Sequence, residues 1–357
     1  MKYTLLLMVL VAIFLSACGG STPVAPTTTP STTPTQTPLP TSTATATAIS
    51  LPPPMLTPEP YWEYSIEYLR SRTYGGGKIE IAETLGQNSA FTRHYFRYDS
   101  DGLSIYGFAN IPHGEGPFPV IIALHGYIEP EIYQTLDYTT HYADALASAG
   151  YLMLHPNLRG YPPSDEGDNL FRVGMAIDVL NLIALVKENS GQPGLLQTAD
   201  PTRIGLWGHS MGGGISTRVL TVSQDVKAAV LYAAMTGDEQ KNYEAIYRWL
   251  NGSMGLEELS VPSEALKRIS PMYFFEDITA PVSIHHGLED KLVPVGWSMQ
   301  TCEQLKSLGK AVECHYYEDM PHTFYGSVDK EFIRYSIQFF DRYLGSAKPG
   351  AASFIAR

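Results

Sequence analysis

Residues 208–212 hold the side chain best placed to do chemistry in this chain. They read Gly-His-Ser-Met-Gly and directly follow the apolar run 203–207. A short strand leading into G-x-S-x-G is typical of a tight strand-to-helix turn that exposes its serine above a sheet. Small residues two positions before and after the serine let the backbone turn without Cβ clashes. We therefore predict that Ser210 is a nucleophile.

A nucleophilic serine needs a base, and the base needs a carboxylate that orients it. Asp290 lies in a turn directly after the apolar segment 282–285, and His322 lies in a loop between the last expected strand and the last expected helix. The chain order Ser, Asp, His is that of the α/β-hydrolase triad. We predict that His322 accepts the Ser210 proton and later protonates the leaving group. Asp290 would hold the imidazole in the correct tautomer.

Each of these assignments has an alternative. Asp290 could be a solvated loop carboxylate, and an acid one strand earlier would be Asp238 or Glu239. His322 could be an ordinary surface histidine. His315 lies inside an expected strand, where a structural role is the better interpretation.

An oxyanion intermediate needs two backbone N–H donors. Met211 follows the nucleophile at the start of a helix, where N–H groups point outward. The second donor is expected from Tyr127, in the loop after the central strand 120–124. We expect His125, in the same loop, to bond the backbone rather than to act as an acid or base.

Aromatic side chains and one arginine are weaker candidates. An apolar substrate pocket could be built from Tyr127, Tyr133, Tyr161 and Trp249, of which Tyr127 is the best supported. Arg159 follows another strand end, and we expect it to form a structural ion pair.

The first sixty residues do not have the composition of a folded domain. Residues 1–17 contain one lysine and then a short apolar run, as in a secretory signal peptide. The segment ends in Leu-Ser-Ala before Cys18, which resembles a bacterial lipobox and predicts a lipid-anchored, extracytoplasmic protein; the alternative is a plain signal with an incidental cysteine. Residues 18–60 are rich in Pro and Thr, with 11 Pro and 13 Thr from position 21 onward. Such a segment cannot bury a core and is expected to be a disordered tether.

Residues 61–357 suit one catalytic domain of α/β class. The formal net charge of −12 argues against nucleic acid and against direct contact with an anionic bilayer. Cys302 and Cys314 could pair outside the cytoplasm, although a helix and a strand position can forbid the geometry. The sequence does not decide between these outcomes. It contains no C-x-x-C, so no zinc site is expected, and a serine triad needs no cofactor.

Apolar runs and helical periodicity alternate over most of the domain, which predicts a mainly parallel, doubly wound sheet. An interruption at about 236–270 predicts a small helical cap over the site. The expected strands are 78–85, 91–98, 103–111, 119–124, 151–154, 203–207, 228–233, 282–285 and 312–317. The expected helices are 137–149, 170–189, 211–223, 297–308 and 329–344.

From about residue 99 to 344 the chain resembles the catalytic domain of the prolyl oligopeptidase family and its dienelactone-hydrolase-like relatives. The matching motifs are 125–127, 159–160, 208–213, the Asp290 turn ending in Val-Pro, and the His322 loop. The resemblance implies an α/β-hydrolase fold and a serine hydrolase.

Two departures shift the expected substrate. Full prolyl oligopeptidases carry a propeller that controls peptide access, and here a signal, a tether and about forty residues precede the hydrolase segment. The pattern at 209–214 also resembles elbows of cutinase-like polyester hydrolases and many esterases. We therefore expect carboxylic esters, with short peptides as the alternative. A binding lipoprotein that kept the fold without catalysis is the alternative of another class.

Overall fold

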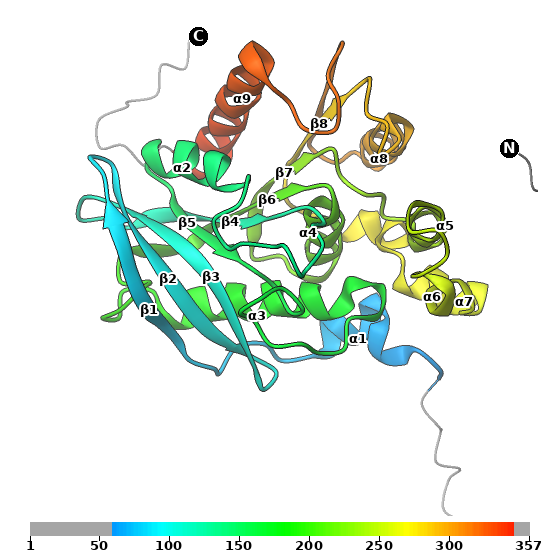
Figure 1. Ribbon diagram of the computed structural model, residues 1–357, viewed down its shortest axis with the longest axis horizontal. Coiled ribbons are helices and arrows are strands. Elements are labelled where there is room, and N and C mark those ends of the chain that lie inside the picture. The colour runs from blue at the N-terminus through cyan, green and yellow to red at the C-terminus, as the bar shows by residue number, and fades with distance from the viewer. Residues whose placement is uncertain (1–58, 346–357) are drawn as a thin grey trace, which may run out of the picture. The chain divides into compact units, whose positions relative to one another are not determined.

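The computed structural model describes residues 59–345 (Figure 1). The predicted signal peptide, Cys18 and the tether up to residue 58 lie outside the described residues. Within residues 59–345, no helix has both the length and the apolar character needed to cross a bilayer.

The described part of the chain is organised around one nine-stranded sheet with the order β1-β2-β3-β5-β4-β6-β7-β8-β9. Strands β1, β2, β3 and β5 pair antiparallel, whereas β5, β4, β6, β7, β8 and β9 pair parallel to their neighbours. The strands are β1 (Ile79–Gln87), β2 (Phe91–Ser100), β3 (Leu103–Pro112), β4 (Phe118–Leu124), β5 (Leu152–Pro156), β6 (Ala199–His209), β7 (Val226–Tyr232), β8 (Val282–Gly287) and β9 (Val312–Tyr317). The mainly parallel sheet predicted from the sequence is confirmed.

Helices cover both faces of this sheet (Figure 1). The α-helices are α1 (Ile66–Ser71), α2 (Thr140–Ser148), α3 (Val173–Asn189), α4 (Met211–Val222), α5 (Glu239–Trp249), α6 (Leu256–Leu259), α7 (Ser263–Ile269), α8 (Val295–Ser307) and α9 (Gly326–Leu344). Three short 3₁₀ segments are η1 (Trp62–Tyr64), η2 (Leu170–Arg172) and η3 (Pro271–Asp277).

The central strand β4 shows why the sheet has two covered faces. All seven of its residues are buried, and its sequence is apolar throughout. Successive side chains of a strand point to opposite faces. Accordingly Val120 and Ile122 belong to the core shared with α3, α4 and α8, whereas Ile121 and Ala123 belong to the core shared with α2 and α9. This is the doubly wound α/β arrangement expected from the sequence.

The helix expected at 170–189 divides in the structure. Phe171 and Arg172 have φ of 54° and 58°, so the chain bends there before α3 begins at Val173. Phe171 is fully buried, and packing of its ring in the core favours this conformation over a continuous helix.

Residues 236–270 form α5, α6 and α7, the helices of the predicted cap. They share a small apolar core with the N-terminal helix α1, which sequence patterns did not reveal. Tyr243 of α5 and Ile269 of α7 meet Leu69 of α1 and Phe171 in this core. The three helices are therefore anchored at the α1–α3 side of the domain.

Cys302 of α8 and Cys314 of β9 form a disulfide with their Cα atoms 6.5 Å apart. The separation lies within the range that disulfides accept. The pairing that the sequence left open is therefore made, and it ties the last parallel strand to the helix that covers it.

Strand β1 forms the exposed edge of the sheet on its antiparallel side. Seven of its nine residues are exposed, and its register against β2 shifts twice, between Ile81 and Glu83 and between Thr84 and Gly86.

Buried histidines make the stability of the fold depend on pH. Burial lowers the pKa of His155 and of His209 to about 3, and it also lowers the pKa of His125 and of His285. Unfolded histidine binds a proton near pH 6.5. Between pH 6.5 and 3 the unfolded state thus binds more protons, and stability falls as pH falls.

We expect the free energy of unfolding to drop below pH 6.5 by up to about 1.4 kcal/mol per pH unit for each such imidazole. Urea unfolding of residues 59–345 at pH 7.5, 6.0 and 5.0 measures the slope. The variant His155→Gln should show a smaller slope than the wild-type protein. An unfolding free energy that stays constant from pH 7.5 to 5.0 would contradict the prediction.

Candidate active site

Ser210 stands between β6 and α4 in a backbone conformation that non-glycine residues rarely adopt, with φ 55° and ψ −115°. Three neighbouring segments hold it there. Its N–H donates to the Tyr232 carbonyl at 2.9 Å, and its own carbonyl accepts from Gly213 N at 3.1 Å and from Met235 N at 3.0 Å. The predicted turn at the nucleophile is present.

The glycines around Ser210 are required by close packing. A Cβ on Gly208 would lie 2.5 Å from the Gly212 carbonyl oxygen and 2.5 Å from Ser216 Oγ. A Cβ on Gly212 would collide with the backbone carbonyl of Leu124. Both positions therefore need glycine so that the helix can begin directly above the strand ends.

Asp290 and His322 meet at the carboxyl ends of β8 and β9. His322 Nδ1–H donates to Asp290 Oδ2 at 2.7 Å. The other carboxylate oxygen accepts from Leu292 N at 2.8 Å and from Val293 N at 2.9 Å. Burial by itself would raise the pKa of this carboxyl, but the hydrogen bonds that it accepts hold the pKa below its ordinary value. The carboxylate therefore stays ionised and keeps the imidazole proton on His322 Nδ1. The lone pair of His322 Nε2 is left free.

A second histidine, His286, contacts the same carboxylate. Its Nε2 lies 3.0 Å from Asp290 Oδ2 and 3.0 Å from the Val293 carbonyl oxygen. Both neighbours are acceptors, so Nε2 carries the proton, and Nδ1 accepts from Ser298 Oγ at 2.7 Å. Sequence reasoning missed this residue; its position four residues before Asp290, at the end of a buried strand, is the signal that could have found it.

Ser210 and His322 lie on neighbouring segments. The ring of His209, the residue before the nucleophile, lies 4.7 Å from the ring of His322. Among residues 59–345, no hydrogen bond joins Ser210 Oγ to His322. Catalytic hydrogen bonds are often long without substrate and shorten in the Michaelis complex. The structure thus brings Asp290 and His322 into contact and places His322 beside the residue that precedes Ser210.

The two predicted oxyanion donors flank the nucleophile. Met211 is the first residue of α4, and Tyr127 directly follows Gly126 in the loop after β4. A Cβ on Gly126 would lie 3.1 Å from the Ser210 Cβ, so this loop closely approaches the serine. In the described part of the chain, neither the Met211 nor the Tyr127 N–H donates to a protein acceptor. Both amides are therefore available to an oxyanion.

His125 occupies the structural position that the sequence suggested. It is fully buried, and its two nitrogens lie 2.7 Å from the Gly126 carbonyl oxygen and 2.9 Å from the Asn157 carbonyl oxygen. Burial lowers its pKa. These contacts fix the oxyanion loop to the neighbouring loop after β5.

The alternative acids have other roles. Glu239 is buried between Arg172 and Arg218, with Arg218 Nη2 at 2.5 Å. Asp238 caps α5 through a hydrogen bond from Lys241 N at 3.3 Å. Neither carboxylate is a hydrogen-bond partner of His322, whereas Asp290 is.

The remaining candidates are structural. Arg159 forms the expected buried ion pair with Asp178 at 2.8 Å, and His315 stacks on His285 with ring centroids 4.7 Å apart.

The four aromatic pocket candidates separate into two groups. Tyr133 and Tyr161 are buried and pack on His125, with ring centroids 4.8 Å and 4.6 Å from its ring. They therefore help to hold the loop that contains Tyr127. Tyr127 is 45% exposed, and its hydroxyl donates to Glu129 at 2.9 Å. Trp249 lies at the end of α5 and is 42% exposed. Tyr127 follows Gly126, which approaches Ser210, and the Tyr161 hydroxyl donates to Met211 Sδ at 4.0 Å.

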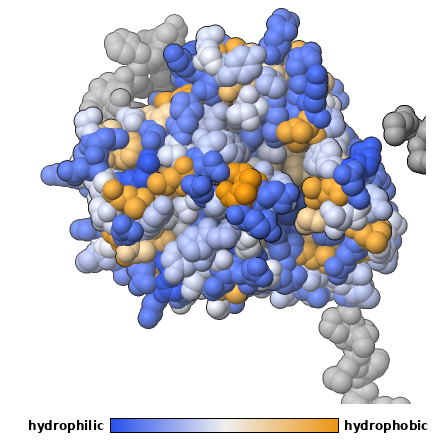
Figure 2. All heavy atoms as spheres, viewed as in Figure 1, coloured by the Kyte–Doolittle hydropathy of each residue, from blue (hydrophilic) through white to orange (hydrophobic). Residues whose placement is uncertain are grey.

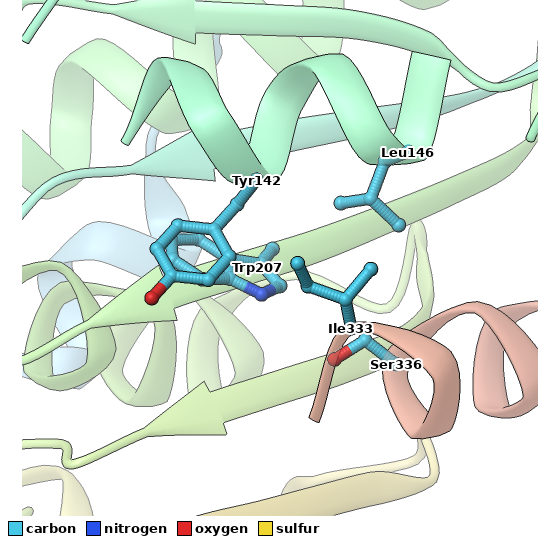
Figure 3. A pocket seen from close by; sticks show the side chains of 5 residues that line it. All are labelled: Tyr142, Leu146, Trp207, Ile333 and Ser336. Carbon is cyan, nitrogen blue, oxygen red and sulfur yellow. The ribbon is translucent and has the colours of Figure 1, made fainter. Parts of the chain in front are cut away.

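A separate gap lies between the sheet and helices α2 and α9 (Figure 3). Its walls are apolar apart from one serine, and none of Ser210, Asp290 and His322 lines it. The lining residues are Tyr142, Leu146, Trp207, Ile333 and Ser336. This gap belongs to the packing of the core.

Part of the chain matches a protein-family model. Residues 181–347, which contain Ser210, Asp290 and His322, match the model of the prolyl oligopeptidase family. The matched region begins within α3, so it takes in the Ser210 turn and the loops that carry Asp290 and His322.

Similar proteins include both lipid and peptide hydrolases. The lysophosphatidylserine lipase ABHD12 of Danio rerio is 24% identical over 60% of this chain and 59% of its own length. The Pyrococcus horikoshii acylaminoacyl peptidase structure is 25% identical with a TM-score of 0.56, covering 74% of this chain and 44% of that chain. An acetyl xylan esterase from Thermoanaerobacterium is 19% identical with a TM-score of 0.58, covering 78% of this chain and 91% of that one. The chain thus spans less than two thirds of the lipase and less than half of the peptidase.

The Asp290–His322 contact can be tested by removing the charge alone. We expect Asp290→Asn to lower kcat by about 10⁴-fold while the protein stays folded, because the amide no longer holds the tautomer that leaves Nε2 free. The matched control is Glu289→Gln, which makes the same change at the neighbouring position. Steady-state turnover of both variants decides the question, and equal activity of the two would remove Asp290 from the site.

Proposed function

We propose that this serine hydrolase of α/β-hydrolase fold, whose residues 181–347 match the prolyl oligopeptidase family, cleaves carboxylic esters through an acyl-enzyme on Ser210. The observation that carries the proposal is the Asp290–His322 hydrogen bond of 2.7 Å beside the constrained turn of Ser210. The amides of Met211 and Tyr127, which donate to no acceptor within residues 59–345, complete the set of groups that acyl transfer needs.

In the proposed reaction, Ser210 Oγ attacks the ester carbonyl while its proton passes to His322 Nε2. The negative oxygen of the tetrahedral intermediate is held by the N–H groups of Met211 and Tyr127. His322 then gives its proton to the departing alkoxide, and the C–O bond breaks to release an alcohol. Water attacks the acyl-enzyme, with His322 again taking a proton, and the carboxylic acid leaves as Ser210 regains its hydrogen. Asp290 stays ionised throughout and stabilises the imidazolium.

The surroundings of the site support an apolar ester. Tyr127 and Leu292 are 45% and 58% exposed, and they belong to the loops that carry an oxyanion donor and the acid, respectively. Tyr325, three residues beyond His322, is 60% exposed. These three exposed side chains lie on loops at the carboxyl ends of parallel strands. Exposed apolar groups at such a place favour an apolar ligand. Figure 2 shows that hydrophobic residues lie in several places among hydrophilic ones on the face in view.

Peptides are the second candidate substrate. The family match and the similarity to an acylaminoacyl peptidase favour it. This chain covers 91% of the acetyl xylan esterase chain but only 44% of the peptidase chain. The larger covered share supports an ester as the substrate.

A panel of p-nitrophenyl esters beside short peptide p-nitroanilides separates the two candidates. We expect Ser210-dependent turnover of the esters, with kcat/KM for the esters exceeding that for the anilides by more than tenfold. Ser210→Ala should lower turnover by roughly 10⁴- to 10⁶-fold without loss of folding. Faster Ser210-dependent cleavage of the anilides would assign the peptidase activity instead. Activity that survives Ser210→Ala would remove Ser210 as the nucleophile.

We further propose that the protein is a secreted lipoprotein anchored to a membrane through Cys18. The lipobox-like Leu-Ser-Ala-Cys segment and the Pro- and Thr-rich residues that follow support this location. Lipid attachment at one cysteine would leave the catalytic domain free at the end of a long tether, since stable anchoring needs only the acyl chains.

The variant Cys18→Ala in the full-length chain tests the anchor. We expect it to move the protein from the membrane pellet to the soluble fraction, while kcat and KM remain within twofold of wild type because the domain is untouched. Fractionation in a bacterial host followed by ester assay measures both. Cys18→Ala protein that still sediments with membranes would overturn the proposal.

A further inference from the structure

A chain of hydrogen bonds runs from the oxyanion loop to the His322 loop through two side chains that the catalytic scheme does not use. Gly126 N–H donates to Tyr138 Oη at 2.9 Å. Tyr138 Oη lies 2.6 Å from His209 Nδ1, and His209 Nε2 lies 3.1 Å from the backbone carbonyl oxygen of His322. Gly126 adjoins Tyr127, so the chain of bonds begins beside one oxyanion donor and ends on the residue proposed as the base.

The direction of each hydrogen bond in this series follows from the chemistry of its two groups. The His322 carbonyl can only accept, so His209 Nε2 carries a proton. Burial, with the neighbouring His322, lowers the pKa of His209 to about 3, so the ring is neutral and Nδ1 accepts. Tyr138 therefore donates its hydroxyl proton to Nδ1 and accepts from Gly126 N–H. Every bond points the same way, from the oxyanion loop toward the base.

Among residues 59–345, the Tyr138 hydroxyl and the His209 ring form no further hydrogen bonds. His209 is 2% exposed, and its ring stands edge-on to Tyr138, with ring centroids 5.5 Å apart, and 4.7 Å from the ring of His322. A Cβ on Gly126 would lie 2.8 Å from Tyr138 Oη and 3.2 Å from His209 Nδ1. Removing the Tyr138 hydroxyl would leave the Gly126 N–H and His209 Nδ1 without this partner, in a space too narrow for a side chain.

The sheet order explains why such a link matters. The oxyanion loop follows β4 and the His322 loop follows β9, and three strands, β6, β7 and β8, separate these two in the sheet. His209 ends β6, directly before the nucleophile. A rigid connection through His209 therefore fixes the positions of both loops relative to the residue that directly precedes Ser210.

We propose that Tyr138 and His209 are positioning residues that fix the Tyr127 amide and the His322 imidazole relative to Ser210. The inference rests on the proposed serine acyl transfer and extends it to residues that contact no reacting atom. It predicts that loosening the chain of bonds weakens stabilisation of the oxyanion and proton transfer together, while binding of the uncharged substrate stays the same. A misplacement of about 1 Å at such a site can lower the rate by about 10²-fold.

The variant Tyr138→Phe removes one hydroxyl from the chain. We expect kcat for p-nitrophenyl butyrate to fall on the order of 10- to 100-fold with KM within twofold. The matched control is Tyr151→Phe. Tyr151 is buried, and its hydroxyl donates to Asp341 at the same 2.6 Å, but it lies directly before β5 next to α9, away from the loops of Ser210 and His322. This control should change kcat by less than twofold.

Variants of His209 give an internal test of rescue. His209→Gln keeps an N–H that can reach the His322 carbonyl, whereas His209→Leu keeps neither bond. We expect the loss of kcat in His209→Gln to be at least fivefold smaller than in His209→Leu. Adding Tyr138→Phe to His209→Leu should cost little more, because the chain is already broken. Independent, fully additive losses would overturn the proposal.

Two readouts separate positioning from a folding defect. Titration of active serine with a fluorophosphonate, which forms a Ser–O–P bond and releases fluoride, gives kcat per competent site. The inhibition constant of an alkyl trifluoromethyl ketone, whose adduct carries an oxyanion, should rise in Tyr138→Phe by the same factor as kcat/KM falls. A loss explained by fewer competent sites, or an unchanged inhibition constant, would overturn the inference.

The same experiment distinguishes failure of the proposed function. If the wild-type protein reacts with the fluorophosphonate but does not cleave the ester, the ester assignment fails, and the rate of phosphonylation in Tyr138→Phe still tests the positioning role. A rate equal to that of Tyr151→Phe would overturn it. A wild-type protein that neither labels nor turns over substrate would overturn both proposals.

Discussion

The backbone of Ser210 is the constraint on which the site depends. A serine at φ 55° and ψ −115° occupies a sparsely populated region that costs about 1–3 kcal/mol, so it persists only when its surroundings impose it. Here β7 supplies an acceptor for its N–H, the first turn of α4 and Met235 supply donors for its carbonyl, and Gly208 and Gly212 allow the close approach. The doubly wound core thus holds Ser210, the proposed nucleophile, in place before any substrate arrives.

Buried polar groups surround this turn and give the loops fixed positions. Asp290 accepts from two histidines and two amides, and its side chain is fully buried. On the other side of α4, Glu239 joins Arg172 and Arg218 and so ties the start of α5 to both α3 and α4. Such networks are costly when one partner is lost, because the remaining charge stays desolvated. They therefore restrict each loop to one arrangement.

The sequence allowed most of the fold to be predicted because its signals are local. A window of about ten residues is enough to recognise the apolar run of β4, the strand before Ser210 and the helix after it. The same holds for the candidate triad, whose members follow recognisable strand ends.

The remaining features depend on contacts between distant segments. Tyr138 meets His209 across 71 positions, and helix α1 is only six residues long and is held by tertiary packing. The bend at Phe171 and Arg172 contradicts the helical periodicity around it, because burial of the Phe171 ring outweighs local preference. The disulfide required the relative placement of α8 and β9, which no spacing rule provides.

The outer edge strand β1 affects how molecules of this protein behave toward one another. An exposed edge normally offers unpaired backbone groups that a second molecule can extend into a continuous sheet. Strand β1 lies at the edge of the sheet (Figure 1). Two register shifts interrupt its regular pairing with β2, and Glu83 adds negative charge to it. A second copy would meet a mismatched hydrogen-bond ladder and like charges. The edge therefore protects the domain from β-type aggregation, even at the high local concentrations that a crowded surface would produce.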